Sequence, residues 1–511
     1  MLFNSYAFVF LFLPLVLLVF MYLEQRQREA AITWLVLASL FFYAWWNPVY
    51  LLLLLFSMAF NFAIGHSLQR RPRGWLLALG VAGNLGLLAW FKYANFLVDT
   101  ANTLAGSDMV LDTIILPLAI SFFTFQQIAW LVDANRGQAA EYNPVHYALF
   151  VSFFPQLIAG PIVHHAEMMP QFGQRRDSDT RLRDLEIGLT IFCLGFLKKV
   201  VLADTASLQA NPVFDAAARG EALTFFEAWG GALAYSFQLY FDFSGYSDMA
   251  IGLGRLFGIR LPVNFFSPYR ATSIIDFWRR WHITLARFLR DYLYIPLGGN
   301  RKGSSRTLRN LMLTMLLGGL WHGAAWTFVF WGGLHGLYLV INRLWRDLRS
   351  RLGWDHSYGR AGRIAAITLT FLAAAVAWVV FRADSFPAAA RIYAGMAGLN
   401  GAVLPPQALA AVGALAEPLQ AAGIRFEAVR YVFGWQEWLW LLLLAVIAFA
   451  FPNVQQLMAR FRPGLMPAYL ELAAGRWQWR PSAAWALGIG LLMAWALLAL
   501  NRVDEFLYFQ F

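Results

Sequence analysis

Histidine is the side chain best suited to proton transfer near neutral pH, and the most unusual of the eight histidines in this chain is His322. It stands in a run, residues 310–342, that contains no charged side chain. An imidazole in such a run is costly unless it forms a hydrogen bond inside a helical bundle or faces a water-filled cavity. Gly319 and Gly323 flank it at a spacing that permits close helix approach. The pattern leaves a functional and a structural role open for His322, and it favours a structural role for His335 in the same run.

The other histidines have more ordinary surroundings. His282 stands at the boundary between the apolar and polar faces of a predicted amphipathic helix, residues 274–292. His164 and His165 precede Glu167, but this spacing is not one of the common zinc patterns, so no metal site is predicted. Three more occupy predicted loops or span ends, where a structural role is the simpler interpretation: His66, His146 and His356.

A polar segment, residues 242–248, separates two apolar runs and contains two carboxylates. Asp242 and Asp248 are six residues apart, so a helix would place them on different faces. We therefore favour a turn or a broken helix whose polar groups are satisfied locally. The sequence contains no G-x-x-x-x-G-K-[ST], H-E-x-x-H or G-x-S-x-G motif, which removes three common types of catalytic or nucleotide-binding site.

The composition indicates that a membrane protein positions these residues. Of the 511 residues, 59% are hydrophobic and 14% are charged. Soluble domains are about 45–50% apolar and about 25% charged, so an ordinary cytosolic enzyme and a disordered chain are excluded. A single cysteine, Cys193, excludes an intramolecular disulfide. Candidate spans are residues 6–23, 30–46, 48–64, 75–91, 113–131, 146–163, 187–203, 223–241, 311–329, 330–345, 364–381, 436–452 and 483–501.

Basic residues predict the orientation of the first spans. They follow the first span, at 26–28, and the third, at 70–73, whereas the turn at 45–48 is uncharged. The positive-inside rule then places the N-terminus in the periplasm and the basic loops in the cytoplasm. Basic residues lie on both sides of 146–163, which leaves open whether this segment crosses the membrane or re-enters it.

The segment 255–310 contains most of the net charge of the chain. It has eleven basic and two acidic residues, whereas the whole chain has a net charge of +11. An ordinary cytoplasmic loop, contact with anionic lipid headgroups, or attraction of a phosphate-bearing donor would each explain this charge. Nucleic acid is a poor explanation because the segment lies between predicted spans. The amphipathic helix 274–292 falls inside it and is expected at the membrane surface.

Four long motifs in this chain resemble the membrane-bound O-acyltransferase family, most closely its bacterial alginate O-acetylation branch. They are residues 238–252, 277–282, 291–301 and 319–323. Shorter similar runs are 1–5, 41–46, 91–95, 158–161, 381–384 and 506–511. The resemblance extends through about residues 1–395 and returns at the last few residues, and it is weak in 396–500.

The resemblance implies an all-α polytopic membrane fold. The family has a ring of helices around a central tunnel, here about 10–13 transmembrane or re-entrant helices. We expect one integral-membrane domain, 1–511, with a core at about 90–395. Residues 396–435, rich in Ala and Pro, are expected to form an extramembrane connector, and 436–511 the C-terminal spans.

The resemblance also implies the site. His322 matches the family's catalytic histidine, and His282 matches the second active-site histidine of the bacterial branch. We hypothesise that His322 is the general base, and that His282 orients it or stabilises the oxyanion of the tetrahedral intermediate. Candidate donor- or substrate-binding residues are Trp278, Arg279, Arg280, Trp281, Asn310, Trp321, Asp242 and Ser244.

The implied activity is transfer of acetyl groups from a cytoplasmic donor, expected to be acetyl-CoA, across a Gram-negative inner membrane to a secreted polysaccharide. Alginate is the favoured acceptor, and cellulose or another exopolysaccharide is the alternative. Related branches O-acetylate peptidoglycan or D-alanylate teichoic acids. A transporter of acyl groups and a scaffold are the non-enzymatic alternatives. Expected partners are the lipid bilayer and periplasmic acetyltransferase or adaptor proteins. No bound cofactor, metal or nucleic acid is expected.

Overall fold

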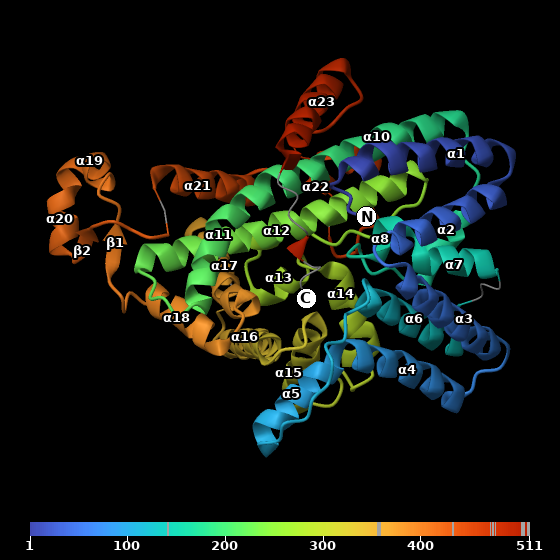
Figure 1. Cartoon of the computed structure of the whole chain (residues 1–511), viewed down its shortest axis with the longest axis horizontal. Coiled ribbons are helices and arrows are strands. Elements are labelled where there is room, and N and C mark those ends of the chain that lie inside the picture. Colours follow the sequence, from blue (N-terminus) through green and yellow to red (C-terminus); the bar gives the residue numbers. More distant parts are fainter. Residues whose placement is uncertain are drawn as a thin grey trace.

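The computed structural model describes residues 1–139, 143–354, 359–431, 434–470, 472, 475, 477–501, 506 and 507. Helices make up most of this described chain (Figure 1). Two short strands in it, β1 (Ala402–Leu404) and β2 (Ile424–Phe426), form a parallel pair. His356, which we predicted in a loop, lies outside the described residues.

Four helical stretches of the described chain are long and apolar enough to cross a membrane: Ala7–Arg26, Pro48–Arg70, Gly74–Ala105 and Arg360–Arg382. Two shorter apolar helices are α21 (Trp435–Ala450) and α23 (Ala483–Leu498). These helices expose large apolar side chains, such as Leu18, Leu52 and Leu442, which suit lipid better than water. The chain is therefore an all-α polytopic membrane protein.

The N-terminal part forms one side of the molecule (Figure 1). Its helices are α1 (Leu13–Arg26), α2 (Arg28–Ala44), α3 (Pro48–Arg70), α4 (Gly74–Leu88), α5 (Ala94–Ala105), α6 (Ile120–Asn135), α7 (Pro144–Ser152) and α8 (Phe154–Leu157). A π-helical segment precedes α1 at Ala7–Phe12, and another joins α4 to α5 at Ala89–Tyr93. The predicted span 113–131 becomes helical only at Ile120. The segment 146–163 forms two short buried helices, neither of which is long enough to cross a bilayer.

The central part of the chain contains the two helices that organise the core, α10 (Ser178–Leu197) and α12 (Phe225–Leu256). Its elements are α9 (His165–Phe172), α10 (Ser178–Leu197), a π-helical turn (Lys198–Ala203), α11 (Asp204–Ala218), α12 (Phe225–Leu256), a short 3₁₀ helix (Pro268–Arg270), α13 (Ile274–Trp278), α14 (Ile283–Leu289), a π-helical turn (Arg290–Tyr294), α15 (Ser304–His322) and α16 (Trp326–Arg351). Figure 1 shows α13 and α14 in the middle of the molecule, between α12 and α15.

Four glycines bring α10 and α12 into backbone contact. A Cβ atom at Gly195 would lie 2.6 Å from the carbonyl oxygen of Gly245, and one at Gly188 would lie 2.8 Å from that of Gly252. Each helix therefore presents two glycines seven residues apart, on the face that meets the other helix. Small residues at such spacings allow membrane helices to pack through their backbones.

The two aspartates of α12 pair with the lysines that follow α10. Lys199 Nζ lies 2.8 Å from an Asp242 carboxylate oxygen, and Lys198 Nζ lies 2.6 Å from Asp248. Because each charge has a buried partner, α12 continues unbroken through both aspartates. Our prediction of a turn or a broken helix at 242–248 was wrong, since it allowed only for local partners.

The predicted amphipathic helix 274–292 is not one helix. It divides into α13 and α14, separated by a reversal at 279–282. Two backbone hydrogen bonds with the preceding loop hold this reversal: Phe266 N–H donates to Arg280 O at 2.9 Å, and Ile283 N–H donates to Asn264 O at 3.0 Å. Hydrophobic periodicity continues across the break, so the pattern alone predicted a single helix.

Ion pairs connect several helix ends on one side of the molecule. We call the side that carries Glu24, Arg28, Arg176, Asp184 and Arg255 the basic face. These ion pairs join the end of α1 and the start of α2 to the first half of α10 and the end of α12. Arg176 donates to Glu24 at 2.8 Å and to Asp184 at 2.9 Å, and Arg255 lies 2.7 Å from Asp184. Arg28 pairs with Glu24 and donates to a carbonyl at the end of α9 at 2.8 Å. These contacts gather the basic ends of distant helices on one side.

The C-terminal part continues with α17 (Arg360–Arg382) and α18 (Phe386–Met396), followed by a small lobe that projects from the body (Figure 1). The lobe contains β1, β2, α19 (Ala408–Val412), a 3₁₀ turn (Gly413–Leu415) and α20 (Ala416–Ala421). It occupies the stretch that we expected to be an extramembrane connector. After α21 come α22 (Val454–Leu457), a 3₁₀ turn (Ala459–Phe461), α23 and a final 3₁₀ turn (Ala499–Asn501).

Candidate active site

The end of α15 positions His322. The helix stops there because Gly323 has an extended backbone, with φ −158° and ψ 150°. Gly319 lets α16 approach closely, since a Cβ atom at this position would lie 2.2 Å from the carbonyl oxygen of Phe328. Lys92, from the π-helical segment between α4 and α5, donates to the carbonyl oxygens of Trp321 at 2.6 Å and of His322 at 3.1 Å. A cation at this end of a helix stabilises its unsatisfied carbonyl groups.

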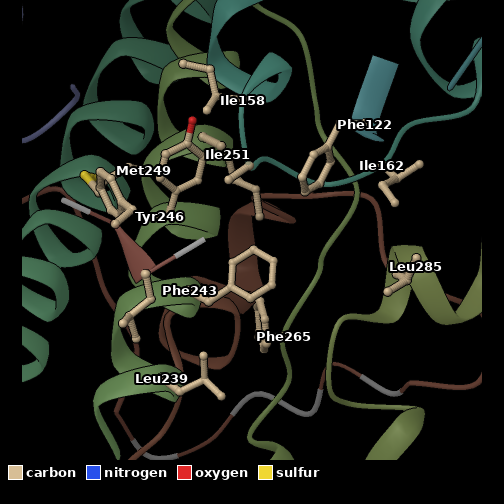
Figure 2. Close-up of a cluster of buried hydrophobic side chains, with 14 of the residues drawn as sticks. Phe122, Ile158, Ile162, Leu239, Phe243, Tyr246, Met249, Ile251, Phe265 and Leu285 are labelled. Carbon is tan, nitrogen blue, oxygen red and sulfur yellow. The ribbon is translucent and has the colours of Figure 1, made fainter. Parts of the chain in front are cut away.

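The reversal between α13 and α14 positions His282. This residue has φ 42°, a left-handed conformation that is uncommon for histidine. Its side chain is fully buried, and its Nδ1 atom lies 3.1 Å from Oδ1 of Asn264. Phe243 of α12 packs edge-on against the imidazole, with ring centroids 4.8 Å apart. Phe265 lies beside Phe243, at 4.9 Å (Figure 2). Helix α12 therefore forms the wall behind His282.

The two histidines face the same small region. Their ring centroids are 6.2 Å apart, which is too far for a direct hydrogen bond between ring nitrogens and leaves room for one bridging atom. Aromatic rings enclose His322, with centroids at 5.1 Å (Trp321), 5.1 Å (Trp331) and 5.5 Å (Phe381). The arrangement holds two imidazoles in an apolar enclosure, where an oxygen atom between them could contact both.

His335 lies behind this pair rather than in it. Its buried ring is 4.7 Å from Trp331 and 5.2 Å from Trp278, measured between centroids. Neither ring nitrogen of His335 has a hydrogen-bond partner among the described residues. Trp331 separates it from His322, so His335 packs as part of the aromatic enclosure.

Chain neighbours of the two histidines line two cavities. The larger, about 700 Å³, is lined by residues adjacent to His282, including Ile283 and Thr284, and by Glu167 of α9. The smaller, about 210 Å³, is lined by Lys92, Phe122 and Trp321, and by Met1 and residues 116–121. Pockets of about 300–1,000 Å³ are typical for small-molecule ligands, which the larger cavity matches.

Basic and polar groups surround the mouth of the larger cavity. Arg279, Arg287 and Arg290 line it, together with Glu167 and Tyr469. Arg287 and Glu167 form a two-bond ion pair at 2.5 and 2.7 Å. The Arg279 guanidinium lies 5.8 Å from the centre of the Tyr469 ring. The lining has an excess of positive charge, which favours an anionic ligand.

Next to this mouth, a polar cluster joins α6, α9 and the π-helical turn after α14. The Tyr292 hydroxyl donates to Asp133 at 2.8 Å and lies 3.2 Å from Nδ1 of His164. Burial, and after it the Arg287 guanidinium, lower the pKa of His164 to about 4. His165 lies 3.5 Å from the same Asp133 carboxylate. Within the described chain, no group of three or more His, Cys, Asp or Glu side chains is placed to hold a metal ion.

The structure brings some of the predicted binding residues to the site and places others elsewhere. Trp278 and Arg279 line the larger cavity, and Trp321 lines the smaller one. Trp281 packs in the aromatic core, 4.9 Å from Trp378 between centroids. Arg280 pairs with Asp276 at 2.8 Å, beside the reversal.

The remaining three predicted binding residues are not among those that line either cavity. Asn310 donates to the carbonyl oxygens of Leu297 and Gly299, and so holds the turn before α15. Asp242 pairs with Lys199 and accepts a hydrogen bond from the backbone of Leu507 at 3.2 Å. Ser244 is buried in α12.

Sequence reasoning missed two residues that contact the histidines. Lys92 and Asn264 are single polar residues in apolar surroundings, which was the available signal. Their partners lie far away in the sequence: Lys92 meets His322 across 230 positions. No local pattern predicts such a contact.

Comparisons with known proteins identify similar sequences. The family model for membrane-bound O-acyltransferases matches residues 2–378. A "Peptidoglycan O-acetyltransferase" of Helicobacter pylori is 48% identical over 401 residues, which cover 73% of this chain and 74% of that protein. A "Probable alginate O-acetylase AlgI" of Pseudomonas putida is 44% identical over 406 residues, covering 78% and 80%. A "Teichoic acid D-alanyltransferase" of Streptococcus thermophilus is 30% identical over 267 residues, covering 51% and 63%.

Proposed function

Because this chain belongs to the membrane-bound O-acyltransferase family, we propose that it transfers acetyl groups from acetyl-CoA to a hydroxyl group in the biosynthesis of a secreted polysaccharide. The observation that carries this proposal is the pair of buried imidazoles, His282 and His322, whose chain neighbours line two cavities. A membrane-bound acyltransferase needs this arrangement because donor and acceptor reach the reacting atoms from different sides.

The reaction is acyl transfer from a thioester to an oxygen. His322 takes the proton of the acceptor hydroxyl while the oxygen attacks the acetyl carbonyl carbon. The C–O bond forms, the C–S bond breaks, and the coenzyme A thiolate leaves. The proton on His322 then neutralises the thiolate. A base positioned in this way typically contributes about 10²–10⁴-fold to the rate. His282 orients His322 or stabilises the oxyanion, and the aromatic enclosure excludes hydrolytic water.

The charge of the larger cavity supports entry of the donor from the basic face. Coenzyme A is anionic, and Arg279 and Arg290 line this cavity. The positive-inside rule makes the basic face cytoplasmic, which places Met1 and the smaller cavity on the periplasmic side. We place the protein in a Gram-negative inner membrane, and we expect a periplasmic acetyltransferase or adaptor protein to complete delivery.

The acceptor is a polysaccharide hydroxyl. Alginate was favoured from the resemblance, and relatives named for alginate are 41–44% identical. A relative named for peptidoglycan is 48% identical, so peptidoglycan is the second candidate. Both polymers are assembled or modified outside the cytoplasm, which suits an acetyl group delivered through the smaller cavity.

The test uses purified protein in detergent or nanodiscs, together with the periplasmic protein expected to complete delivery, and radiolabelled acetyl-CoA. Coenzyme A release and labelled product are measured with alginate oligosaccharides and with peptidoglycan fragments, in separate reactions. We expect His322→Ala to lower both by about 10²-fold or more. His66→Ala, a histidine near the end of α3, is the matched control.

The outcomes separate the alternatives. Wild-type rates in His322→Ala would exclude this histidine as the base. Binding of acetyl-CoA without release of coenzyme A, with any acceptor, would favour a transporter. Product with only one polymer would identify the acceptor class.

A further inference from the structure

Asn264 is the direct protein partner of His282. Its Oδ1 atom lies 3.1 Å from Nδ1 of His282. The same oxygen accepts the backbone N–H of Thr284 at 3.2 Å and the Thr284 hydroxyl at 2.9 Å. The Asn264 side chain is fully buried, so these contacts are shielded from solvent.

The orientation of the Asn264 amide follows from these partners. A backbone N–H can only donate, so the atom that faces Thr284 N must be the carbonyl oxygen. The amide nitrogen then points to Ser247 of α12, where it donates to the hydroxyl at 3.4 Å. The Thr284 hydroxyl accepts the N–H of Ile162 at 3.0 Å, which leaves its own proton for Asn264. All four of these hydrogen bonds are therefore consistent with Oδ1 of Asn264 as an acceptor.

The orientation of Asn264 determines the tautomer of His282. Because Oδ1 only accepts, Nδ1 of His282 must carry a hydrogen. A neutral imidazole has one N–H, so its Nε2 is then unprotonated. We propose that Asn264 is a positioning residue that holds His282 in the Nδ1–H tautomer, so that His282 enters the reaction as a hydrogen-bond acceptor through Nε2. This inference rests on the proposed acyl transfer.

The inference decides between the two roles considered for His282. An unprotonated Nε2 accepts a hydrogen bond from a group that bridges the gap to His322, and it donates none to the oxyanion. His282 therefore takes the orienting role. The left-handed backbone of His282 and the hydrogen bond from Ile283 N–H to Asn264 O fix both residues in one small unit. Rotation of the ring would break the bond to Asn264.

The first test reads the tautomer directly and needs no acyl transfer. Protein labelled with ¹⁵N-histidine is studied by NMR at neutral pH, and His282→Gln identifies the signals of this residue. We expect the Nδ1–H form in the wild type. An Nε2–H form would overturn the proposal, whether or not the protein transfers acetyl groups. Absence of transfer together with the Nδ1–H form would instead contradict the proposed function.

The second test measures acetyl transfer against pH. Asn264→Leu removes the acceptor, and we expect activity to fall by about 10–100-fold, as when the outer partner of a functional histidine is lost. Asn264→Asp keeps an acceptor, and we expect it to restore much of that loss at high pH. Its carboxylate favours the protonated imidazole, so the acid limb of the pH–rate profile should move to higher pH.

A matched variant controls for the loss of a buried asparagine. Asn84 exchanges side-chain hydrogen bonds with Asn61 between α3 and α4, away from both histidines. We expect Asn84→Leu to keep its activity within about twofold per folded molecule, since the hydrogen bond it loses affects stability. Equal losses in folded Asn264→Leu and Asn264→Asp, with no change in the pH profile, would show a packing role and overturn the proposal.

Discussion

The ammonium group of Lys92 donates a hydrogen bond to the carbonyl oxygen of His322, at 3.1 Å. The contact joins the segment between α4 and α5 to the last residue of α15, and the same ammonium reaches Trp321 O at 2.6 Å. The position of the candidate base therefore depends on a charge from the N-terminal part of the chain.

Replacing Lys92 tests this dependence. We expect Lys92→Met to lower acetyl transfer by at least about tenfold, because hydrogen bonds from a charged group contribute about 1.5–3 kcal/mol and here they fix the end of α15. Lys92→Arg keeps a donor and should recover part of the activity. The measurement is coenzyme A release at saturating acetyl-CoA. Equal activity in Lys92→Met and the wild type would show that α15 ends correctly without this cap.

Adding one methyl group at Gly319 should displace His322. Its Cβ would lie 2.2 Å from Phe328 O and 3.0 Å from the Cα of Gly332, both backbone atoms that cannot move alone. We expect Gly319→Ala to destabilise the protein by about 1–3 kcal/mol and to reduce activity sharply. Thermal unfolding in detergent and transfer assays measure the two effects. Gly86→Ala is the control, since nothing lies within 4 Å of its Cβ position.

Arg279 should affect donor binding more than chemistry. It is exposed, lines the larger cavity, and lies 5.8 Å from the centre of the Tyr469 ring, near the outer limit of a cation–π contact. We expect Arg279→Gln to raise KM for acetyl-CoA several-fold with little change in kcat, and the difference from the wild type to shrink as salt screens the charge. Arg70→Gln, also at a basic helix end but not among the residues that line this cavity, should leave KM unchanged. A fall in kcat with constant KM would contradict a role in donor binding.

His164 should make stability depend on pH. Its pKa is lowered to about 4 from 6.5, so between these values the unfolded chain binds a proton that the folded protein does not. Folding stability therefore rises with pH from about 4 to 6.5 and is constant above this range. The free energy of unfolding is measured at pH 4.5 and at pH 7 by thermal unfolding. Its increase between these pH values should be smaller in His164→Gln than in the wild type, by about 1–2 kcal/mol after allowance for partial exposure of the side chain. An unchanged difference would mean that other groups cause the pH dependence.

Candidate site residues could be picked out from the sequence, whereas the backbone that holds them could not be predicted from it. His322 stood out because no charge surrounds it, and Gly319 was correctly expected at a close helix contact. Both signals are local. The family motifs then added His282, which local pattern placed only at the edge of a helix.

The predictions that failed share one physical cause. The break between α13 and α14 depends on hydrogen bonds from Phe266 and Ile283, which no periodicity encodes. The continuity of α12 depends on Lys198 and Lys199, whose charges neutralise its two aspartates across about 50 positions of sequence. Each error treated a polar group as if its partners had to be neighbours along the chain.

The glycine contacts between α10 and α12 restrict how the two helices can move. A slip of one residue would bring a side chain against backbone at both contact points, Gly188 with Gly252 and Gly195 with Gly245. Helix α10 therefore cannot slide along α12 by one residue, and the two helices keep one axial position relative to each other. Phe243, against which His282 packs, belongs to α12. The glycine contacts between α10 and α12 therefore fix the position of the His282 imidazole along these helices, although none of the four glycines touches His282.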